Sequence, residues 1–286
     1  MLPITSCTVC RRFTQLFQYS IESIVNIIDE ILILDDSCEE DVDYTNFAKY
    51  SNIKIIKSDE FGNDLGKKKQ YLANISKHEI VMRWDDDFIL YNADLMRTIC
   101  DIMREQTLDF VITQNYNISF SLDYVNTSQP YCDEIYIYRK SVLEFQHKKG
   151  FPDYPLLHKN HNDLLSKSID ECLFLHMSNF KSYESILYRS FMCAFCSQTK
   201  YLNYYEWLFY ERNKRNPSSE DELLQFKSIN IDYIKKRTYP LTSVKLIQPP
   251  LNFEILNPSL VSFIRNNFKI IFTNDANFTY EVNLPH

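Results

Sequence analysis

A chain of 286 residues, of which 45% are hydrophobic and 24% charged, fits one large globular domain or a domain with a sizeable appendage. The formal net charge of −7 argues against an extended basic surface for nucleic acid. An anionic ligand therefore needs a local positive site or a metal ion.

The eight cysteines have no repeated spacing, and several lie in apolar surroundings, as is typical of reduced core thiols. Cys7 and Cys10 form a Cys-x-x-Cys pair, and so do Cys193 and Cys196, but neither pair has the setting of a zinc or redox site. No basic stretch followed by a long apolar run marks a signal peptide, and no apolar segment approaches the roughly 20 residues of a membrane span. We expect a soluble, cytoplasmic protein.

Strands and helices alternate over the first 110 residues. Short runs of apolar residues predict strands at 3–9, 31–34, 53–56, 79–84 and 110–113. Apolar residues spaced by three and four predict helices at 13–28, 66–76 and 94–105. This alternation predicts an α/β fold with a doubly wound, mostly parallel sheet, because crossover connections are right-handed in nearly all cases.

Two of these strands end in aspartates. Asp35 and Asp36 follow the second strand, and Asp85, Asp86 and Asp87 follow the fourth. The crevice beyond the carboxyl ends of the strands is the usual ligand site of such sheets, and carboxylates there suit a hard divalent cation and its phosphates. A solvated acidic turn is the simpler alternative. The chain has only three glycines, which argues against Rossmann and P-loop nucleotide binding.

The pattern weakens beyond residue 115. A strand is expected at 134–139, a helical turn at 141–145, a helix from residue 164 onward and a short strand at 173–176. Residues 183–237 look mostly helical and rich in tyrosine and phenylalanine, and a proline-containing extended tail follows from residue 239. We expect a nucleotide-sugar-binding and catalytic domain at 1–180 and a helical, aromatic-rich region with an extended tail at 181–286.

The order of these features in residues 1–180 resembles the GT-A-fold glycosyltransferases, in particular the family 2 inverting enzymes. The family typically has two aspartates and a small residue after the second strand, as in Asp35-Asp36-Ser37. The resemblance implies that Asp36 binds the uracil or ribose of a UDP-sugar and that Thr8 lies beside the base. The family often has Pro-x-Tyr-Asn after the first strand, and this chain departs from it there.

The resemblance also implies how the diphosphate is bound. Lys67 or Lys68, which follow Gly66, would pair with the phosphates, although a solvated basic helix face is an equal alternative. The acidic run looks like the family's Asp-x-Asp (DXD) motif, in which Asp87 ligates Mn²⁺ or Mg²⁺.

Three further residues belong to the implied site. Asp85 would contact the ribose or, through water, the metal, and Asp86 is part of the same donor-binding run. His176 resembles the histidine that completes the metal or phosphate site in many such folds, although a single histidine at the end of an apolar strand is more often structural.

An inverting transferase also needs a carboxylate to take the proton from the acceptor hydroxyl. Asp163 stands where the family has an acidic residue and is the candidate base, with Asp153 and Asp170 as alternatives. Capping the helix expected from Leu164 is an equally good role for Asp163.

The sequence therefore predicts a metal-dependent glycosyltransferase that moves a sugar from a UDP-sugar to a glycan, lipid-linked or protein acceptor with inversion. A haloacid-dehalogenase-type phosphatase also places Asp-x-Asp after a buried strand. A catalytically inactive GT-A-like scaffold is the non-enzymatic alternative. Basic residues at 212–215 and 235–237 fit peripheral contact with an anionic membrane, or more simply solvated helix ends.

Overall fold

The computed structural model describes most of the first 177 residues and parts of the remainder. The described residues are 1–10, 14–36, 43–57, 60–61, 64–122, 124–126, 131–148, 151–157, 163–177, 180, 206, 209–210, 213–229, 236–240, 246–247, 251–272 and 277–282. The Cys193-x-x-Cys196 pair and Asn162 lie outside them.

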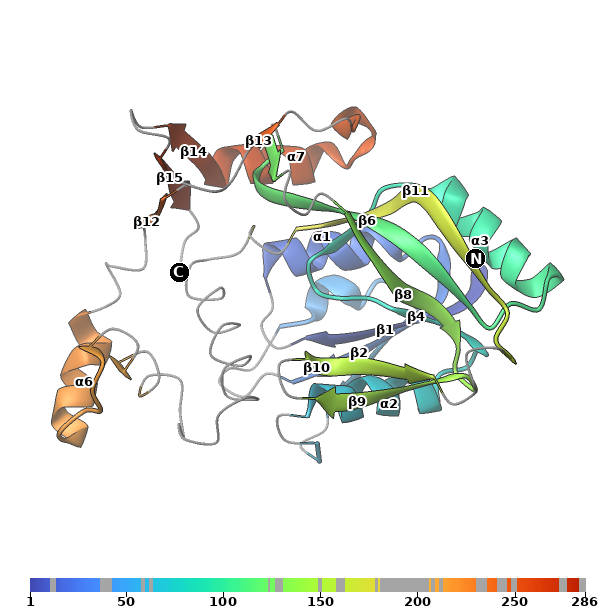
Figure 1. Ribbon diagram of the computed structural model, residues 1–286, viewed down its shortest axis with the longest axis horizontal. Helices are drawn as coiled ribbons and strands as arrows, with labels where there is room; N and C mark the ends of the chain where they lie inside the picture. Colours follow the sequence, from blue (N-terminus) through green and yellow to red (C-terminus); the bar gives the residue numbers. More distant parts are fainter. Residues whose placement is uncertain are drawn as a thin grey trace.

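The described residues form a ten-stranded mixed sheet with helices on both faces, so the predicted α/β class is confirmed (Figure 1). Its main path has the order β13-β7-β6-β8-β4-β1-β2-β3, and β11 joins it through β6 while β5 pairs with β11. The strands are β1 (Leu2–Cys10), β2 (Ile28–Asp35), β3 (Ile53–Lys57), β4 (Ile80–Arg83), β5 (Phe88–Leu90), β6 (Phe110–Ser121), β7 (Tyr124–Asn126), β8 (Tyr131–Arg139), β11 (Ser166–His176) and β13 (Leu246–Ile247).

The parallel part of the sheet is the part that the sequence predicted. Strands β3, β2, β1 and β4 pair in parallel, as the crossover connections require. Strand β8 runs antiparallel between β4 and β6, and β11 is parallel to β6 but antiparallel to β5. The sheet is therefore parallel on one side of β4 and mixed on the other.

Three helices cover the sheet. They are α1 (Gln15–Ile24), α2 (Leu65–Ile75) and α3 (Ala93–Glu105), and a short 3₁₀ helix, η1 (Thr45–Phe47), follows β2. Helices α1 and α3 pack on one face around Trp84, whereas α2 packs on the other face through Leu72 and Ala73. Side chains alternate along β1, so Cys10 faces the first core and Cys7 the second.

Two local predictions beyond residue 140 are wrong, one of them in part. Of the expected helical turn at 141–145, residues 141–142 do form a turn, but residues 143–145 begin β9 (Leu143–Lys148), which pairs with β10 (Phe151–Leu157) and lies beside α2. The expected helix from residue 164 is instead β11, so Asp163 caps no helix. In both segments pairing with a neighbouring strand overrides the local preference.

The region after residue 180 is not only helical. Its described elements are α6 (Glu220–Ile229), β12 (Lys236–Pro240), the 3₁₀ helix η4 (Phe253–Ile255), α7 (Pro258–Asn267), β14 (Phe268–Phe272) and β15 (Asn277–Val282). Strands β12, β15 and β14 form a small antiparallel sheet. Leu260 and Ile264 of α7 share a core with Tyr116 of β6 and Leu175 of β11, so α7 packs on the sheet. Within the described part of the chain, no helix has the length and apolar character needed to cross a bilayer.

Candidate active site

The carboxyl ends of β1, β2 and β4 meet at one edge of the sheet. Cys10 of β1 pairs with Asp35 of β2, and the Asp36 amide donates to the Cys10 carbonyl over 2.8 Å. On the other side of β1, the Trp84 amide donates to the Cys7 carbonyl over 3.0 Å. The two acidic segments therefore flank the same strand at the same end, as the sequence predicted.

Two consecutive lysines of α2 hold these acidic segments. The ammonium group of Lys68 pairs with Asp36, and that of Lys69 lies 2.8 Å from Asp85 Oδ1. Both lysines are buried, whereas Lys67 lies outside and pairs with Asp64. Of the two predicted phosphate lysines, the structure brings only Lys68 to the acidic edge.

Lys69 is not among the predicted site residues, although helical periodicity identifies it. Leu72 and Ala73 form the inner face of α2, and the residues four positions earlier are Lys68 and Lys69. Lys67 is instead in line with Tyr71, which is only half-buried. The same spacing that predicts the apolar face of a helix therefore identifies which two of three consecutive lysines point inward.

Arg83 is a third cation at this edge. Its Nη2 lies 3.6 Å from Asp85 Oδ2, and its guanidinium lies 4.8 Å from the centre of the Tyr136 ring. The two Asp85 oxygens thus face two different cations. An aromatic face and a carboxylate together stabilise a nearly buried guanidinium.

Helix α1 fixes the backbone of the acidic run. Ser20 Oγ accepts from Trp84 Nε1 over 2.9 Å and donates to the Asp85 carbonyl over 3.3 Å. One turn later, Ser23 Oγ accepts from the Leu90 amide over 3.1 Å. Ser20 is buried and Ser23 is half-buried, and together they bind both ends of the segment that carries Asp85, Asp86 and Asp87.

Asp87 and His176 lie next to one another. Asp87 is buried, and its Oδ1 lies 3.6 Å from His176 Nε2. The Met177 amide donates to the Asp87 carbonyl over 2.9 Å, which joins the end of β11 to the acidic run. The structure therefore brings together two of the three residues, Asp85 being the third, that the family resemblance assigned to the metal.

Within the described residues, no three or more His, Cys, Asp or Glu side chains are grouped as a metal site. The chemistry of the donors still allows a partial site. Asp87 and His176 offer oxygen and nitrogen, and Mg²⁺ or Mn²⁺ in nucleotide enzymes commonly takes only one or two protein ligands, with substrate phosphates and water. Asp85 fits this role poorly because Lys69 and Arg83 face its oxygens.

Thr8 and Asp86 lie at the same edge. Thr8 is fully buried on β1, and its Oγ1 has no hydrogen-bond partner. Asp86 is half-buried in the turn between β4 and β5. A buried hydroxyl without a partner is costly, so Thr8 Oγ1 is a polar group for which a ligand at this edge would be favourable.

Asp163 lies apart from this edge. It precedes Leu165, whose amide donates to Asp109 Oδ2 over 3.1 Å just before β6 begins. In the β11–β6 pair, Ser166 is opposite Phe110 and His176 is opposite Asn117. These two pairs are seven residues apart along β6, which corresponds to roughly 23 Å at about 3.3 Å per residue.

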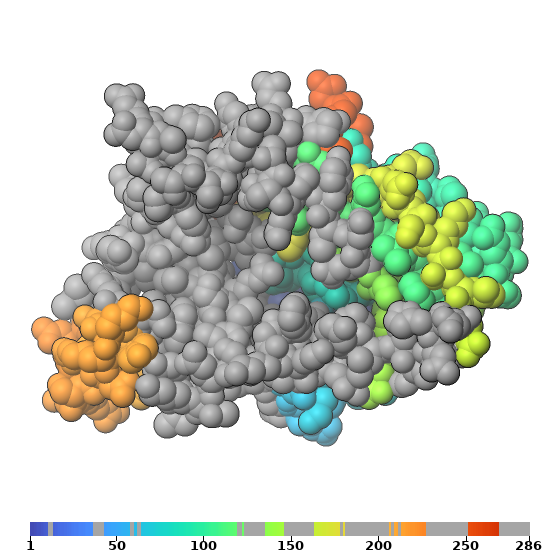
Figure 2. Space-filling model, in the orientation of Figure 1, coloured from blue at the N-terminus to red at the C-terminus, as the bar shows by residue number. Residues whose placement is uncertain are grey.

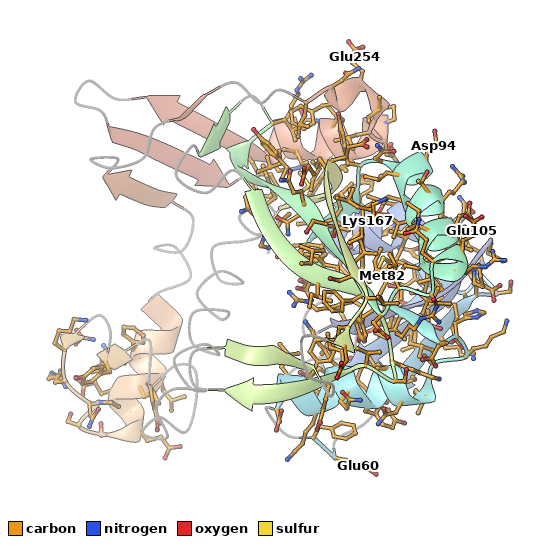
Figure 3. The ribbon with its side chains drawn as sticks, turned by 45° about the vertical axis from the view of Figure 1, so that its right-hand side comes forward. Glu60, Met82, Asp94, Glu105, Lys167 and Glu254 are labelled. Carbon is orange, nitrogen blue, oxygen red and sulfur yellow. The ribbon has the colours of Figure 1, made fainter. Side chains whose placement is uncertain are left out.

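The surface position of this segment agrees with the register. The first half of β11, drawn in yellow, is visible on the surface in Figure 2, and Lys167 is labelled there in Figure 3. The structure therefore does not bring Asp163 to the acidic edge. Asp170 is exposed on the same half of β11, and the side chain of Asp153 lies outside the described part.

The described thiols agree with the prediction of reduced core cysteines. Cys7, Cys10 and Cys100 are buried and form no disulfide, and Cys172 is half-buried. Burial raises the pKa of Cys7 well above its usual value and that of Cys172 to about 12, so both thiols stay protonated. Cys7 and Cys10 face opposite cores, which excludes a shared metal or disulfide between them.

No protein-family model and no curated protein matches the chain. Among solved structures, S. aureus TarS 1–349 is similar at a TM-score of 0.43 and 12% identity, covering 81% of this chain and 82% of that chain. The same protein with UDP-GlcNAc gives 0.43 and 13%, covering 80% and 73%. Its complex with UDP gives 0.43 and 12%, covering 66% and 64%. The likeness is too distant to support a functional conclusion.

Proposed function

We propose that the chain is a glycosyltransferase that transfers a sugar from a nucleotide sugar, of which a UDP-sugar is the first candidate, to a hydroxyl acceptor. The observation that carries the proposal is the pairing of Asp36 and Asp85, from the ends of β2 and β4, with the adjacent buried residues Lys68 and Lys69. Carboxylates from two strands that flank a third mark the ligand site of an open α/β sheet.

The charges at this edge suit a nucleoside diphosphate that is bound together with a divalent cation. The whole chain has a net charge of −7, yet Lys68, Lys69 and Arg83 gather here. Asp36, Asp85, Asp86 and Asp87 at the same edge outnumber these three cations, so a bound divalent cation would have to supply the positive charge that an anionic ligand needs. Asp36 would bind the ribose or base beside Thr8, and the three cations would hold the two carboxylates in position.

A divalent cation would be held by Asp87 and His176. When bound, it would supply positive charge to the phosphate oxygens of the leaving group. The chain's own contribution is to hold the donor while the bond between the anomeric carbon and the phosphate oxygen breaks and the acceptor oxygen bonds to that carbon. Inversion, which the family resemblance implies, requires the acceptor proton to pass to a base, and we assign no such role to Asp163.

A thermal-shift series tests donor binding. The parent is melted with UDP or UDP-GlcNAc, the ligands found in the TarS structures, each with and without Mn²⁺. A ligand at about 100 times its Kd adds about 2.7 kcal/mol to the free energy of unfolding, which shifts the melting temperature by several degrees. No shift with any nucleotide sugar would reject the proposal.

Two variants and two assays sharpen this test. Asp87→Asn should abolish the Mn²⁺-dependent part of the shift, whereas Asp94→Asn, in an exposed residue of α3 labelled in Figure 3, should leave it unchanged. Mn²⁺-dependent hydrolysis of UDP-GlcNAc would distinguish an enzyme from an inactive scaffold. Phosphate release from a phosphomonoester would instead indicate a phosphatase.

A further inference from the structure

We propose that Asn117 is a positioning residue that fixes the tautomer of His176. In this tautomer Nδ1 carries the proton, and Nε2 keeps a lone pair for a divalent cation beside Asp87. The inference rests on the proposed metal-dependent function, but the tautomer itself is measurable without metal or substrate.

Three side chains form a row across the sheet at this level. His176 of β11 is directly opposite Phe88 of β5 on one side and Asn117 of β6 on the other. Residues opposite one another on paired strands present their side chains to the same face. The register of three strands therefore sets these contacts of the imidazole.

The hydrogen bond to Asn117 determines where the imidazole proton lies. His176 Nδ1 is 2.8 Å from Asn117 Oδ1. A carbonyl oxygen has no proton to give, so Nδ1 must donate, and in a neutral imidazole Nε2 then carries only a lone pair. The orientation of the Asn117 amide thus decides which nitrogen is available to a metal ion.

The distance to Asp87 agrees with this assignment. His176 Nε2 lies 3.6 Å from Asp87 Oδ1, too far for a hydrogen bond. A lone pair on nitrogen and a carboxylate oxygen do not attract one another, but both are attracted to a cation. Their proximity is therefore favourable when a divalent cation is shared between them.

Packing holds the ring in this orientation. The His176 ring meets the Phe88 ring edge-on, with centroids 5.1 Å apart and an interplanar angle of 89°. The neighbouring Met177 amide donates to the Asp87 carbonyl. A 180° flip of the ring about the Cβ–Cγ bond would put Cδ2 in the place of Nδ1 and so break the Asn117 hydrogen bond.

Asn115 provides a matched control. It lies two residues earlier on β6, and its Nδ2 donates to the Tyr136 hydroxyl over 2.7 Å. Asn115→Ala removes a buried asparagine and one hydrogen bond from the same strand but leaves the His176 contact intact. Any effect that it shares with Asn117→Ala is a general loss of stability.

The first measurement is the tautomer of His176 by long-range ¹H–¹⁵N NMR of the metal-free chain, at alkaline pH where imidazoles are neutral. The chain has six histidines, and His176→Gln assigns the signal by removing it. We expect the Nδ1–H form in the parent and in Asn117→Asp, which keeps an acceptor oxygen. Asn117→Ala should shift the ring toward Nε2–H, and an Nε2–H signal in the parent would overturn the inference.

The second measurement is Mn²⁺ binding in the presence of UDP, followed by the EPR signal of free Mn²⁺. Loss of a residue that orients a metal ligand typically costs 10–100-fold in metal affinity, so we expect a loss of about 10-fold or more for Asn117→Ala. Asn117→Asp and Asn115→Ala should stay near the parent. Equal affinities of Asn117→Ala and Asn115→Ala would overturn the inference.

Failure of the proposed function gives a different result. If the parent has the Nδ1–H form but binds no Mn²⁺ with UDP, the metal assignment is wrong. The inferred role of Asn117 in metal binding is then wrong as well. If the parent binds Mn²⁺ and has the Nε2–H form, the metal assignment stands and only the inference about Asn117 fails.

Discussion

Lysine–carboxylate clusters lie at both ends of the parallel strands, and they are built differently. At the amino end, Lys54 and Lys77 are 63% and 61% exposed and reach back to Glu30 and Asp29. At the carboxyl end, Lys68 and Lys69 are only 1% and 3% exposed, and the carboxylates they hold are 12% and 30% exposed. Lys57, 70% exposed beside buried Asp35, repeats the amino-end arrangement there, so the two buried lysines are what distinguishes the carboxyl end.

The difference separates a structural cluster from a functional one. A solvated lysine that caps a buried carboxylate satisfies that carboxylate at little cost, as at Glu30, which also accepts from Thr5 Oγ1 and the Lys77 amide. A buried lysine is expensive to desolvate, and a partly exposed carboxylate does not need it for its own solvation. Buried lysines beside partly exposed carboxylates are explained if the lysines hold the carboxylates in a fixed orientation at a ligand site.

The largest effect should come from removing a buried lysine. Lys69→Met leaves Asp85 with Arg83 and removes positive charge from the carboxyl end. We expect the affinity for UDP with Mn²⁺ to fall by about 10-fold or more and the free energy of unfolding to fall by about 1–3 kcal/mol, as for a hydrogen bond to a charged group. Calorimetric titration and urea unfolding measure the two effects.

Lys54→Met is the matched change at the amino end. Because its ammonium is mostly solvated, the free energy of unfolding should change by no more than about 1 kcal/mol, and UDP affinity should stay at the parent value. Equal UDP affinity in Lys69→Met and Lys54→Met would remove the distinction between the two ends.

The next effect comes from the contact between α1 and the acidic run. Ser20→Ala leaves the Trp84 indole N–H without its acceptor in the core, which costs about 1–3 kcal/mol of unfolding free energy. It also removes the Ser20 hydrogen bond to the Asp85 carbonyl, to which the Phe88 amide still donates, so UDP affinity should fall as well. Ser23→Ala, which loses the contact to the Leu90 amide, should lower stability in urea without lowering UDP affinity. A similar affinity for both variants would argue against a role of Ser20 at the site.

The sequence was sufficient for the parallel part of the fold and for the meeting of the two acidic segments at one edge of the sheet. Continuous apolar runs and helical spacing identify β1 to β4 and α1 to α3, because each segment has one clear period. Parallel strands put their carboxyl ends on one edge, so Asp36 and Asp85 were predictable neighbours. The pair of Asp87 and His176 was expected from family resemblance, and the register of β5 with β11 accounts for it.

The sequence was not sufficient where pairing partners decide the structure. Residues 143–148 and 166–172 have weak local signals and become strands only through β10 and β6. The position of Asp163 away from the acidic edge follows from this, since a strand that starts at Ser166 carries residue 163 to the far end of the sheet. Asn117 was missed because a polar residue in a strand has no recognisable pattern until the opposite residue is known.

A smaller effect is expected on the free energy of unfolding at low pH, and it comes from Glu30 at the amino ends of the parallel strands. Burial by itself raises the pKa of Glu30, but hydrogen bonds from Lys54, the Lys77 amide and Thr5 outweigh it and lower the pKa below the usual 4.5. A carboxylate with a lowered folded-state pKa stabilises the fold above its unfolded pKa, and this stability is lost as the pH falls through the folded value. Urea unfolding between pH 7 and about pH 3 should therefore show a falling free energy below about pH 4.5.

Glu30→Gln tests this assignment, because a neutral amide does not titrate. The variant should be less stable at pH 7 and should lose less stability on acidification than the parent. Asp29, whose pKa is lowered by hydrogen bonds with Lys77 and His78, keeps part of the pH dependence. An acid dependence equal to that of the parent would exclude Glu30 as a source of it.

The smallest expected effect is that of Asp163→Asn. A general base must lie within about 3 Å of the proton it accepts, and the β11–β6 register puts residue 163 roughly 20 Å from Asp87. As an exposed substitution it should leave stability, UDP affinity and donor hydrolysis within about twofold of the parent. A loss of activity of about 100-fold at unchanged stability would be that of a missing base. Such a loss would mean that residue 163 reaches the acceptor. The pairing of Ser166 with Phe110 does not allow this, so the register of β11 would then be wrong.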